Sequence, residues 1–218
     1  MDQIDNLQET FLSALDRAQT ASYPFRHWLL EDVLPATACR AVSELPFDPP
    51  AVGDTLGKRE THNSTRTFFS PGNRDRFAVC DALARTLQSE STVSRLSRQC
   101  DVDLHGSYLR IEYCQDSGAF WLEPHTDIGA KLFTMLVYLS EGPGSEEWGT
   151  DIYTADGIHV GSAPYGFNRG LIFVPGADTW HGFERRPIEG VRKSLIVNYV
   201  KDEWRSRHEL AFPLRPVS

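Results

Sequence analysis

A histidine and an aspartate separated by one residue, His125 and Asp127, form the pattern in this sequence with the clearest chemistry. If the stretch 124–127 (Pro-His-Thr-Asp) is extended, both side chains point to the same face of a strand. An imidazole nitrogen and a carboxylate oxygen suit a borderline divalent metal such as Fe(II). His181, which follows the apolar run 171–174 and a Pro-Gly turn, is the candidate third ligand. The three residues predict a metal site with open coordination positions. The competing interpretation is a solvated histidine beside a turn aspartate.

A second pattern lies eleven residues after His181, where Arg192 and Ser194 alternate on one face of a predicted last strand. A guanidinium and a hydroxyl together can hold a carboxylate. An inward arginine in an otherwise apolar strand is costly unless an anion meets it. The alternative is a structural ion pair with one of the many acidic residues. Lys131, just past the His-x-Asp pair, is a second and weaker candidate for gripping the carboxylate.

The strands that could position these residues are confined to the second half of the chain. Short β-prone runs follow one another there, separated by turn signals such as Asp156-Gly157 and Pro175-Gly176. Many short strands with frequent turns favour a sandwich or a jelly-roll barrel. The predicted strands are 107–114, 132–139, 151–154, 170–174 and 192–200.

The first half has helical spacing of apolar residues instead. We expect helices at 3–19, from Pro35 to near Leu45, and at 74–98, with an extended segment at 24–29 and a long loop at 46–73 that holds one strand near 65–69. The chain is therefore predicted to be one α+β domain with a mainly β core. Its parts are a helical lead-in and support (1–103), the β core (104–200) and a C-terminal tail (201–218). Turn chemistry makes the loops 48–64, 115–122 and 141–149 candidates for substrate lids.

Composition limits the function classes. The formal net charge of −8 argues against a dedicated nucleic-acid binder, because phosphate contacts need clustered Lys and Arg. No apolar run is long enough to span a membrane, and the polar N-terminus does not read as a secretory signal. The four cysteines form no CxxC pair, which argues against a disulfide framework or a zinc site and favours a cytoplasmic protein.

The order His-x-Asp, distant His, then Arg-x-Ser resembles the 2-oxoglutarate/Fe(II)-dependent dioxygenases, and within them the prolyl-hydroxylase-like branch. The resemblance covers roughly residues 104–200. The stretches that carry it, besides 124–127, are 109–113 (LRIEY), 133–139 (FTMLVYL), 149–153 (GTDIY) and 170–175 (GLIFVP). A weaker similarity extends to residues 24–45, whose PF…W…LP pattern is similar to the lead-in helices of many members.

The resemblance implies a double-stranded β-helix with Fe(II) in its mouth, and 2-oxoglutarate and O2 as co-substrates. It implies that Arg192 grips the distal carboxylate of 2-oxoglutarate with help from Ser194, and that Tyr113 and Tyr138 contact the co-substrate. The implied reaction hydroxylates a C–H bond and converts 2-oxoglutarate to succinate and CO2. Because Asp127 supplies a carboxylate where halogenases of this superfamily lack one, hydroxylation is favoured over halogenation. Desaturation or ring formation stays open.

Several functions remain open at this level. A small-metabolite oxygenase acting on an amino acid, a sugar or a natural-product intermediate is favoured by the compact chain. The alternatives are a peptidyl (prolyl-type) hydroxylase and a non-enzymatic β-barrel binding module. A cupin-type metalloenzyme is disfavoured because cupins usually show His-x-His. Arg66, Arg110 and Arg169 could meet an anionic substrate, but pairing with exposed carboxylates is the simpler expectation. The oligomeric state is left open, a homodimer included.

Overall fold

Two antiparallel sheets form the centre of the protein, which is described here from a computed structural model covering residues 3–50, 54–58 and 66–218. The larger sheet has seven strands in the order β1-β2-β9-β6-β11-β4-β3, and the smaller has four in the order β5-β10-β7-β8. The strands are β1 (Gln19–Ala21), β2 (His27–Leu30), β3 (Thr67–Phe68), β4 (Tyr108–Gly118), β5 (Leu122–His125), β6 (Lys131–Tyr138), β7 (Asp151–Tyr153), β8 (His159–Ser162), β9 (Gly170–Phe173), β10 (His181–Phe183) and β11 (Ile188–Val200).

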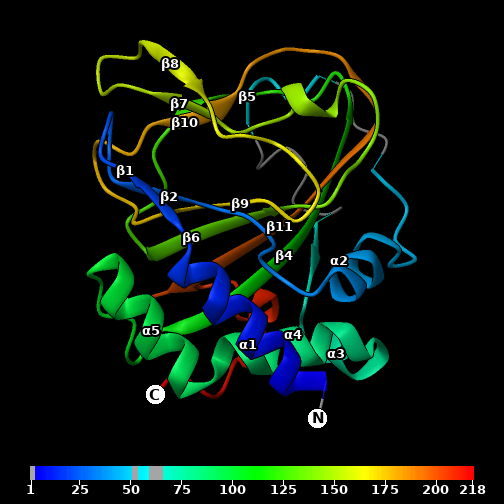
Figure 1. Cartoon of the computed structure of the whole chain (residues 1–218), viewed down its shortest axis with the longest axis vertical. Coiled ribbons are helices and arrows are strands. Elements are labelled where there is room, and N and C mark those ends of the chain that lie inside the picture. Colours follow the sequence, from blue (N-terminus) through cyan, green and yellow to red (C-terminus); the bar gives the residue numbers. More distant parts are fainter. Residues whose placement is uncertain (1–2, 51–53, 59–65) are drawn as a thin grey trace.

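Helices cover one face of the larger sheet, and the smaller sheet faces its other side (Figure 1). The described helices are α1 (Gln3–Asp16), α2 (Ala36–Ser43), α3 (Pro71–Arg76), α4 (Ala78–Gln88) and α5 (Glu90–Cys100), with short 3-10 turns at Ser145–Glu147 and Arg207–Glu209. None of the helices in these ranges is long and apolar enough to cross a membrane.

Side-chain alternation along the larger sheet divides the apolar interior in two. On β11, Leu195, Val197 and Tyr199 face the helices and join the larger apolar cluster. Ile196 points the other way and packs against the smaller cluster between the two sheets. Arg192 and Ser194 lie on this second face by the same alternation. The larger sheet thus has an apolar face toward the helices and a partly polar face toward the space between the two sheets.

The predicted fold class is confirmed, and all five predicted strands occur. The single helix predicted at 74–98 is wrong, because the chain forms three helices over residues 71–100. The breaks fall at Phe77 and Ser89, whose backbones are extended. The helix predicted to 19 ends at Asp16, since residues 19–21 form β1 against β2.

The C-terminal tail and one of the predicted lid loops are tied into the sheets. Leu210 forms a β-bridge with Arg110, and the backbone of Val217 donates to Ser107, so the tail packs beside β4. Of residues 115–122, 115–118 are the end of β4, 119–121 connect it to β5 in the other sheet, and Leu122 begins β5. Of the loop 48–64, residues 51–53 and 59–64 lie outside the described residues.

Candidate metal and substrate site

Two histidines meet where the edge strand of the smaller sheet pairs with its neighbour. His125 ends β5 and His181 begins β10, and the two are direct partners in the antiparallel register. Their ring centroids are 4.4 Å apart. Residues 56 positions apart in the sequence are thus placed together by a single strand pairing.

Asp127 joins the two histidines, although it does not lie on an extended strand as predicted. β5 ends at His125, so Asp127 lies in the following turn and not on the strand itself. Its side chain is nonetheless 5% exposed and turned inward. One ligand atom from each of His125, Asp127 and His181 lies within 4.8 Å of the others, a geometry that could hold one metal ion.

Hydrogen bonds fix the tautomer of both histidines. The Nδ1 of His125 donates to the carbonyl oxygen of Glu123 at 2.8 Å, and the Nδ1 of His181 donates to that of Thr179 at 2.9 Å. Because a carbonyl can only accept, each Nδ1 must carry the hydrogen, which leaves each Nε2 with a free lone pair. This is the arrangement found around histidines that bind metals.

The electrostatic environment favours the protonation states that metal ligands need. Burial, with the neighbouring His125 adding to it, lowers the pKa of His181 to about 4, so its imidazole is neutral near pH 7. Burial acts to raise the pKa of Asp127, but the Lys131 charge and hydrogen bonds from Lys131 and Thr134 outweigh it and hold the pKa at about 2. A neutral imidazole beside an ionised carboxylate needs no proton loss before it binds a cation.

Close backbone contact keeps the two histidine strands at this spacing. Gly182 follows His181 on β10, and a Cβ built there would lie 2.8 Å from the carbonyl oxygen of Leu122 and 3.2 Å from that of Glu123. Those atoms belong to the backbone of β5. Only glycine therefore lets β5 approach closely enough for His125 to meet His181.

We expect Gly182→Ala to push β5 away from β10 and to weaken metal binding. The overpacking should cost about 1–3 kcal/mol of folding stability, and the affinity for Mn(II) or Fe(II) measured by calorimetry should fall. Gly72→Ala is the matched control, because a Cβ at Gly72 has no neighbour within 4 Å. Unchanged metal affinity in Gly182→Ala would show that the strand spacing does not set the site.

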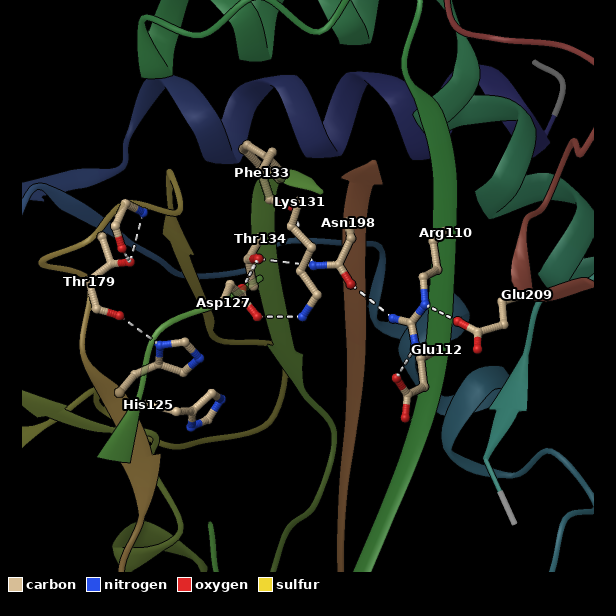
Figure 2. Close-up of polar contacts among 12 residues, drawn as sticks. Arg110, Glu112, His125, Asp127, Lys131, Phe133, Thr134, Thr179, Asn198 and Glu209 are labelled. Carbon is tan, nitrogen blue, oxygen red and sulfur yellow. Dashed lines mark hydrogen bonds and ion pairs between the residues drawn. The ribbon is translucent and has the colours of Figure 1, made fainter. Parts of the chain in front are cut away.

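A chain of buried hydrogen bonds runs from Asp127 across the larger sheet (Figure 2). Thr134 on β6 donates to Asp127 Oδ2 at 2.6 Å, and Asn198 on β11 donates to Thr134 Oγ1 at 2.9 Å. Arg110 on β4 donates in turn to Asn198 Oδ1 at 2.9 Å. Lys131 contacts the other oxygen, Oδ1. The carboxylate of Asp127 is thus oriented from both sides.

Removing one link of this chain should weaken metal binding without unfolding the protein. Thr134→Val keeps the shape of the side chain and removes its hydroxyl, and the loss of such a supporting partner costs about 10–100-fold in metal affinity. Thr86→Val is the control, because the Thr86 hydroxyl is buried in α4 without a partner among the described residues. Calorimetric titration with Mn(II) compares the two, and equal affinities would contradict a role for Thr134.

The three grouped residues open into a cavity of about 320 Å³ between the sheets. Apolar side chains line its middle: Phe120, Leu122, Leu136, Phe183 and Ile196. Residues 54–58 lie at one side of the cavity. A hydrogen bond from Thr55 Oγ1 to the Trp121 carbonyl (2.5 Å) holds them to the segment before β5, and one from the Glu123 amide to the Gly57 carbonyl (3.0 Å) holds them to β5 itself. These residues belong to the predicted lid at 48–64, of which 48–50 and 54–58 are described.

Arg192 lines the same cavity and is 3% exposed. Its Nε donates to the Trp148 carbonyl at 2.8 Å and its Nη1 to Asp116 at 2.7 Å. Arg192 thus forms the structural ion pair that was the alternative interpretation, and it also lines the cavity, while its contact with a co-substrate stays a prediction. Its Nη2 has no hydrogen-bond partner among the described residues, so it has donors to offer a bound carboxylate.

The other predicted co-substrate contacts lie at different places. Ser194 Oγ is buried on the cavity side of β11 with no partner in the described part of the chain. Tyr138 is fully buried and donates to Thr150 Oγ1 at 2.9 Å, and Thr150 lines the cavity. Tyr113 points to the opposite face of the sheet, where its hydroxyl donates to the Ser43 carbonyl at 3.1 Å. Tyr113 is therefore not placed to contact a ligand in this cavity.

Of the three arginines expected to pair at the surface, only Arg169 does so, with the exposed Glu31. Arg110 is 1% exposed, and both Arg110 and Arg66 line the cavity beside Glu112. Strand alternation could have indicated this, since Arg110 and Glu112 share a face of β4. The sequence gives no signal for the roles of four further residues, because their contacts depend on strand register and on the tail: Asp116, Thr134, Asn198 and Trp204.

Comparisons with known proteins identify the fold. No protein-family model and no curated protein sequence matches this chain. Among solved structures it is similar to a Pseudomonas putida prolyl-4-hydroxylase, with a TM-score of 0.57, 15% identity and coverage of 89% of this chain and 99% of that one. A Trichoplax adhaerens prolyl hydroxylase, solved in complex with a hypoxia inducible factor peptide fragment, is also similar. Its TM-score is 0.57 and its identity 15%, and the match covers 90% of this chain and 90% of that one.

A third similar structure is the viral collagen prolyl hydroxylase of Paramecium Bursaria Chlorella virus-1, with a TM-score of 0.53, 14% identity and coverage of 80% of this chain and 96% of that one. That protein was solved as a 2OG complex. At these identities the likeness concerns the fold, and it extends over most of both chains. The chain therefore shares the fold of these prolyl hydroxylases, which agrees with the predicted double-stranded β-helix.

Proposed function

We propose that the protein is an Fe(II)- and 2-oxoglutarate-dependent oxygenase that hydroxylates a C–H bond of a small polar metabolite. The observation that carries this proposal is the convergence of His125, Asp127 and His181 in a cavity that also contains Arg192. Two imidazoles and one carboxylate on one side of a metal are the ligand set of non-haem Fe(II) oxygenases.

The residues fit both the metal and the co-substrate. Each histidine points its Nδ1 hydrogen at a carbonyl oxygen, so Nε2 is the nitrogen left for a metal, and Asp127 is ionised. Arg192 lines the cavity and its Nη2 has a free donor for a carboxylate, while the unpartnered hydroxyl of Ser194 lies on the same face of β11 but does not line the cavity. Asp116 beside Arg192 holds the guanidinium in place, and it also offsets part of the positive charge that a carboxylate would meet.

The chain's own contribution is binding, orientation and exclusion of water. Bound iron would supply the oxygen chemistry, with conversion of 2-oxoglutarate to succinate and CO2. His125, Asp127 and His181 would hold the metal on one side and leave its other side to ligands. Arg192 would orient the co-substrate, and the apolar residues in the middle of the cavity would keep the reacting groups dry.

A peptidyl prolyl hydroxylase is the second candidate, favoured by the likeness to prolyl hydroxylases that include one solved with a peptide. The cavity volume favours the metabolite. About 320 Å³ is near the lower end of the range of about 300–1,000 Å³ for small-molecule pockets. The co-substrate would already take part of that space.

An anaerobic titration tests the proposal. The protein should bind one Fe(II), and 2-oxoglutarate should then bind only to the metal-loaded form and produce the weak visible charge-transfer band of the chelate. A protein that binds neither metal nor 2-oxoglutarate would instead be a β-barrel binding module. A screen of metabolites and proline peptides for succinate release then separates the two candidate substrate classes.

A further inference from the structure

The end of the cavity away from the histidines is lined by buried charges of both signs. Arg66 forms a two-point ion pair with Glu112, with Nε at 2.8 Å from Oε1 and Nη2 at 2.5 Å from Oε2. Arg110 donates to Glu112 at 2.8 Å and to Glu209 at 2.6 Å. The side chains of Arg110 and Glu112 are 1% and 2% exposed. Charges buried this deeply in the wall of a cavity are costly, so a binding role is worth testing.

The tail supplies a further polar group here. Trp204 lines the cavity and stacks near Arg110, with the guanidinium carbon 5.4 Å from the ring centroid. Its indole Nε1 is buried and has no hydrogen-bond partner among the residues described. A buried N–H donor without a partner normally costs free energy, which an acceptor on a ligand could recover.

The charges that the described residues place around the cavity balance. Among those residues, five basic side chains line it, Lys58, Arg66, Arg110, Lys131 and Arg192, against three acidic ones, Glu112, Glu123 and Asp127. Two further carboxylates, Asp116 and Glu209, pair with Arg192 and Arg110. Fe(II) with doubly charged 2-oxoglutarate would add no net charge. A ligand with a net charge would therefore bring an uncompensated charge into the cavity, whereas a zwitterion would not.

The distance to the candidate metal ligands suits a small molecule. Figure 2 shows Arg110 and Glu112 on β4, separated by β11 from Thr134 on β6 and from Asp127 beside it. Strands in a sheet lie about 4.8 Å apart, so β4 and β6 are about 10 Å apart. A head group held on β4 would place a carbon several bonds away near the metal position.

We propose that this charged end binds the head group of a free α-amino acid, with Arg66 meeting its carboxylate and Glu112 its ammonium group. The inference rests on the proposed function and names its substrate class. A zwitterion can insert into the Arg66–Glu112 pair. Its carboxylate takes the place of Glu112 beside Arg66, and its ammonium group takes the place of Arg66 beside Glu112. The side chain of the amino acid then extends past Ile196 toward the metal position and is the part that is oxidised.

Calorimetry on the full chain, loaded anaerobically with Fe(II) and 2-oxoglutarate, tests this with the twenty L-amino acids as probes. At least one should bind. Its N-acetyl and carboxamide derivatives should each bind about tenfold more weakly or worse, because each loses one charge-assisted interaction. Arg66→Gln should weaken binding of the free amino acid by a similar factor and leave 2-oxoglutarate binding unchanged.

Arg95→Gln is the matched control, because Arg95 pairs with Asp16 on the helical layer, outside the cavity. The derivative series uses the unmodified protein and does not depend on how any variant folds. If no amino acid binds while 2-oxoglutarate does, the amino-acid inference is overturned and the proposed function stands. Tighter binding of a blocked proline tripeptide would also overturn it. Failure to bind 2-oxoglutarate would overturn both.

Discussion

His181→Ala should abolish metal-dependent binding of 2-oxoglutarate and any succinate formation. The variant removes one of three ligand atoms, and the loss of metal affinity should exceed the factor of about 10–100 that a supporting residue contributes. His181 is 8% exposed, so the variant also leaves a cavity and should lose some stability. Metal content after dialysis, followed by calorimetry with 2-oxoglutarate, measures the effect.

His105→Ala is the control for this experiment, because His105 is exposed and does not line the cavity. It should behave like the unmodified protein. Thermal unfolding of both variants separates a loss of ligand from a loss of fold. A folded His181→Ala variant that keeps one equivalent of tightly bound iron would remove the basis for the proposed metal site.

Arg192→Met should have two large and separable effects. Removing the guanidinium takes away the group that pairs with the Asp116 carboxylate at 2.7 Å, and that carboxylate is 3% exposed. Breaking a buried ion pair from one side typically costs about 3–5 kcal/mol of folding stability. Affinity for 2-oxoglutarate should fall as well, because the donors for its distal carboxylate are gone.

The double variant Arg192→Met/Asp116→Asn distinguishes these effects. With no charge left at either position, it should regain much of the lost stability, since replacing both members of a buried pair is often close to neutral. Its affinity for 2-oxoglutarate should stay low. Denaturant unfolding and calorimetry provide the two measurements. Normal affinity in the double variant would show that Arg192 is a structural residue only.

The sequence predicted correctly those features that depend on residues close together in the chain. Alternation along the last strand placed Arg192 and Ser194 on one face, and the turn signals at Asp156-Gly157 and Pro175-Gly176 do fall between strands. The grouping of His125 with His181 followed from the predicted jelly roll. Its actual cause, direct pairing of β5 with β10, depends on a register that spacing alone does not determine.

The misplaced features depend on long-range contacts. Tyr113 pairs with Leu195, whose side chain faces the helices, and this register puts the tyrosine on the same side. The Asp116–Arg192 pair and the Thr134–Asn198 link also join residues on neighbouring strands that are far apart in sequence. A continuous helical pattern over 74–98 gave no sign that Ser89 would adopt an extended backbone.

The position of β5 at the edge of the smaller sheet has a consequence for folding. β5 pairs only with β10 among the described strands, so one ladder holds it. A cation shared by His125, Asp127 and His181 would act as a cross-link across that ladder and would oppose fraying of the edge. Loading with metal should then slow amide hydrogen exchange in residues 122–127 and leave exchange in the middle of β11 unchanged. The local order of this edge strand would therefore depend on how much metal is available to the protein.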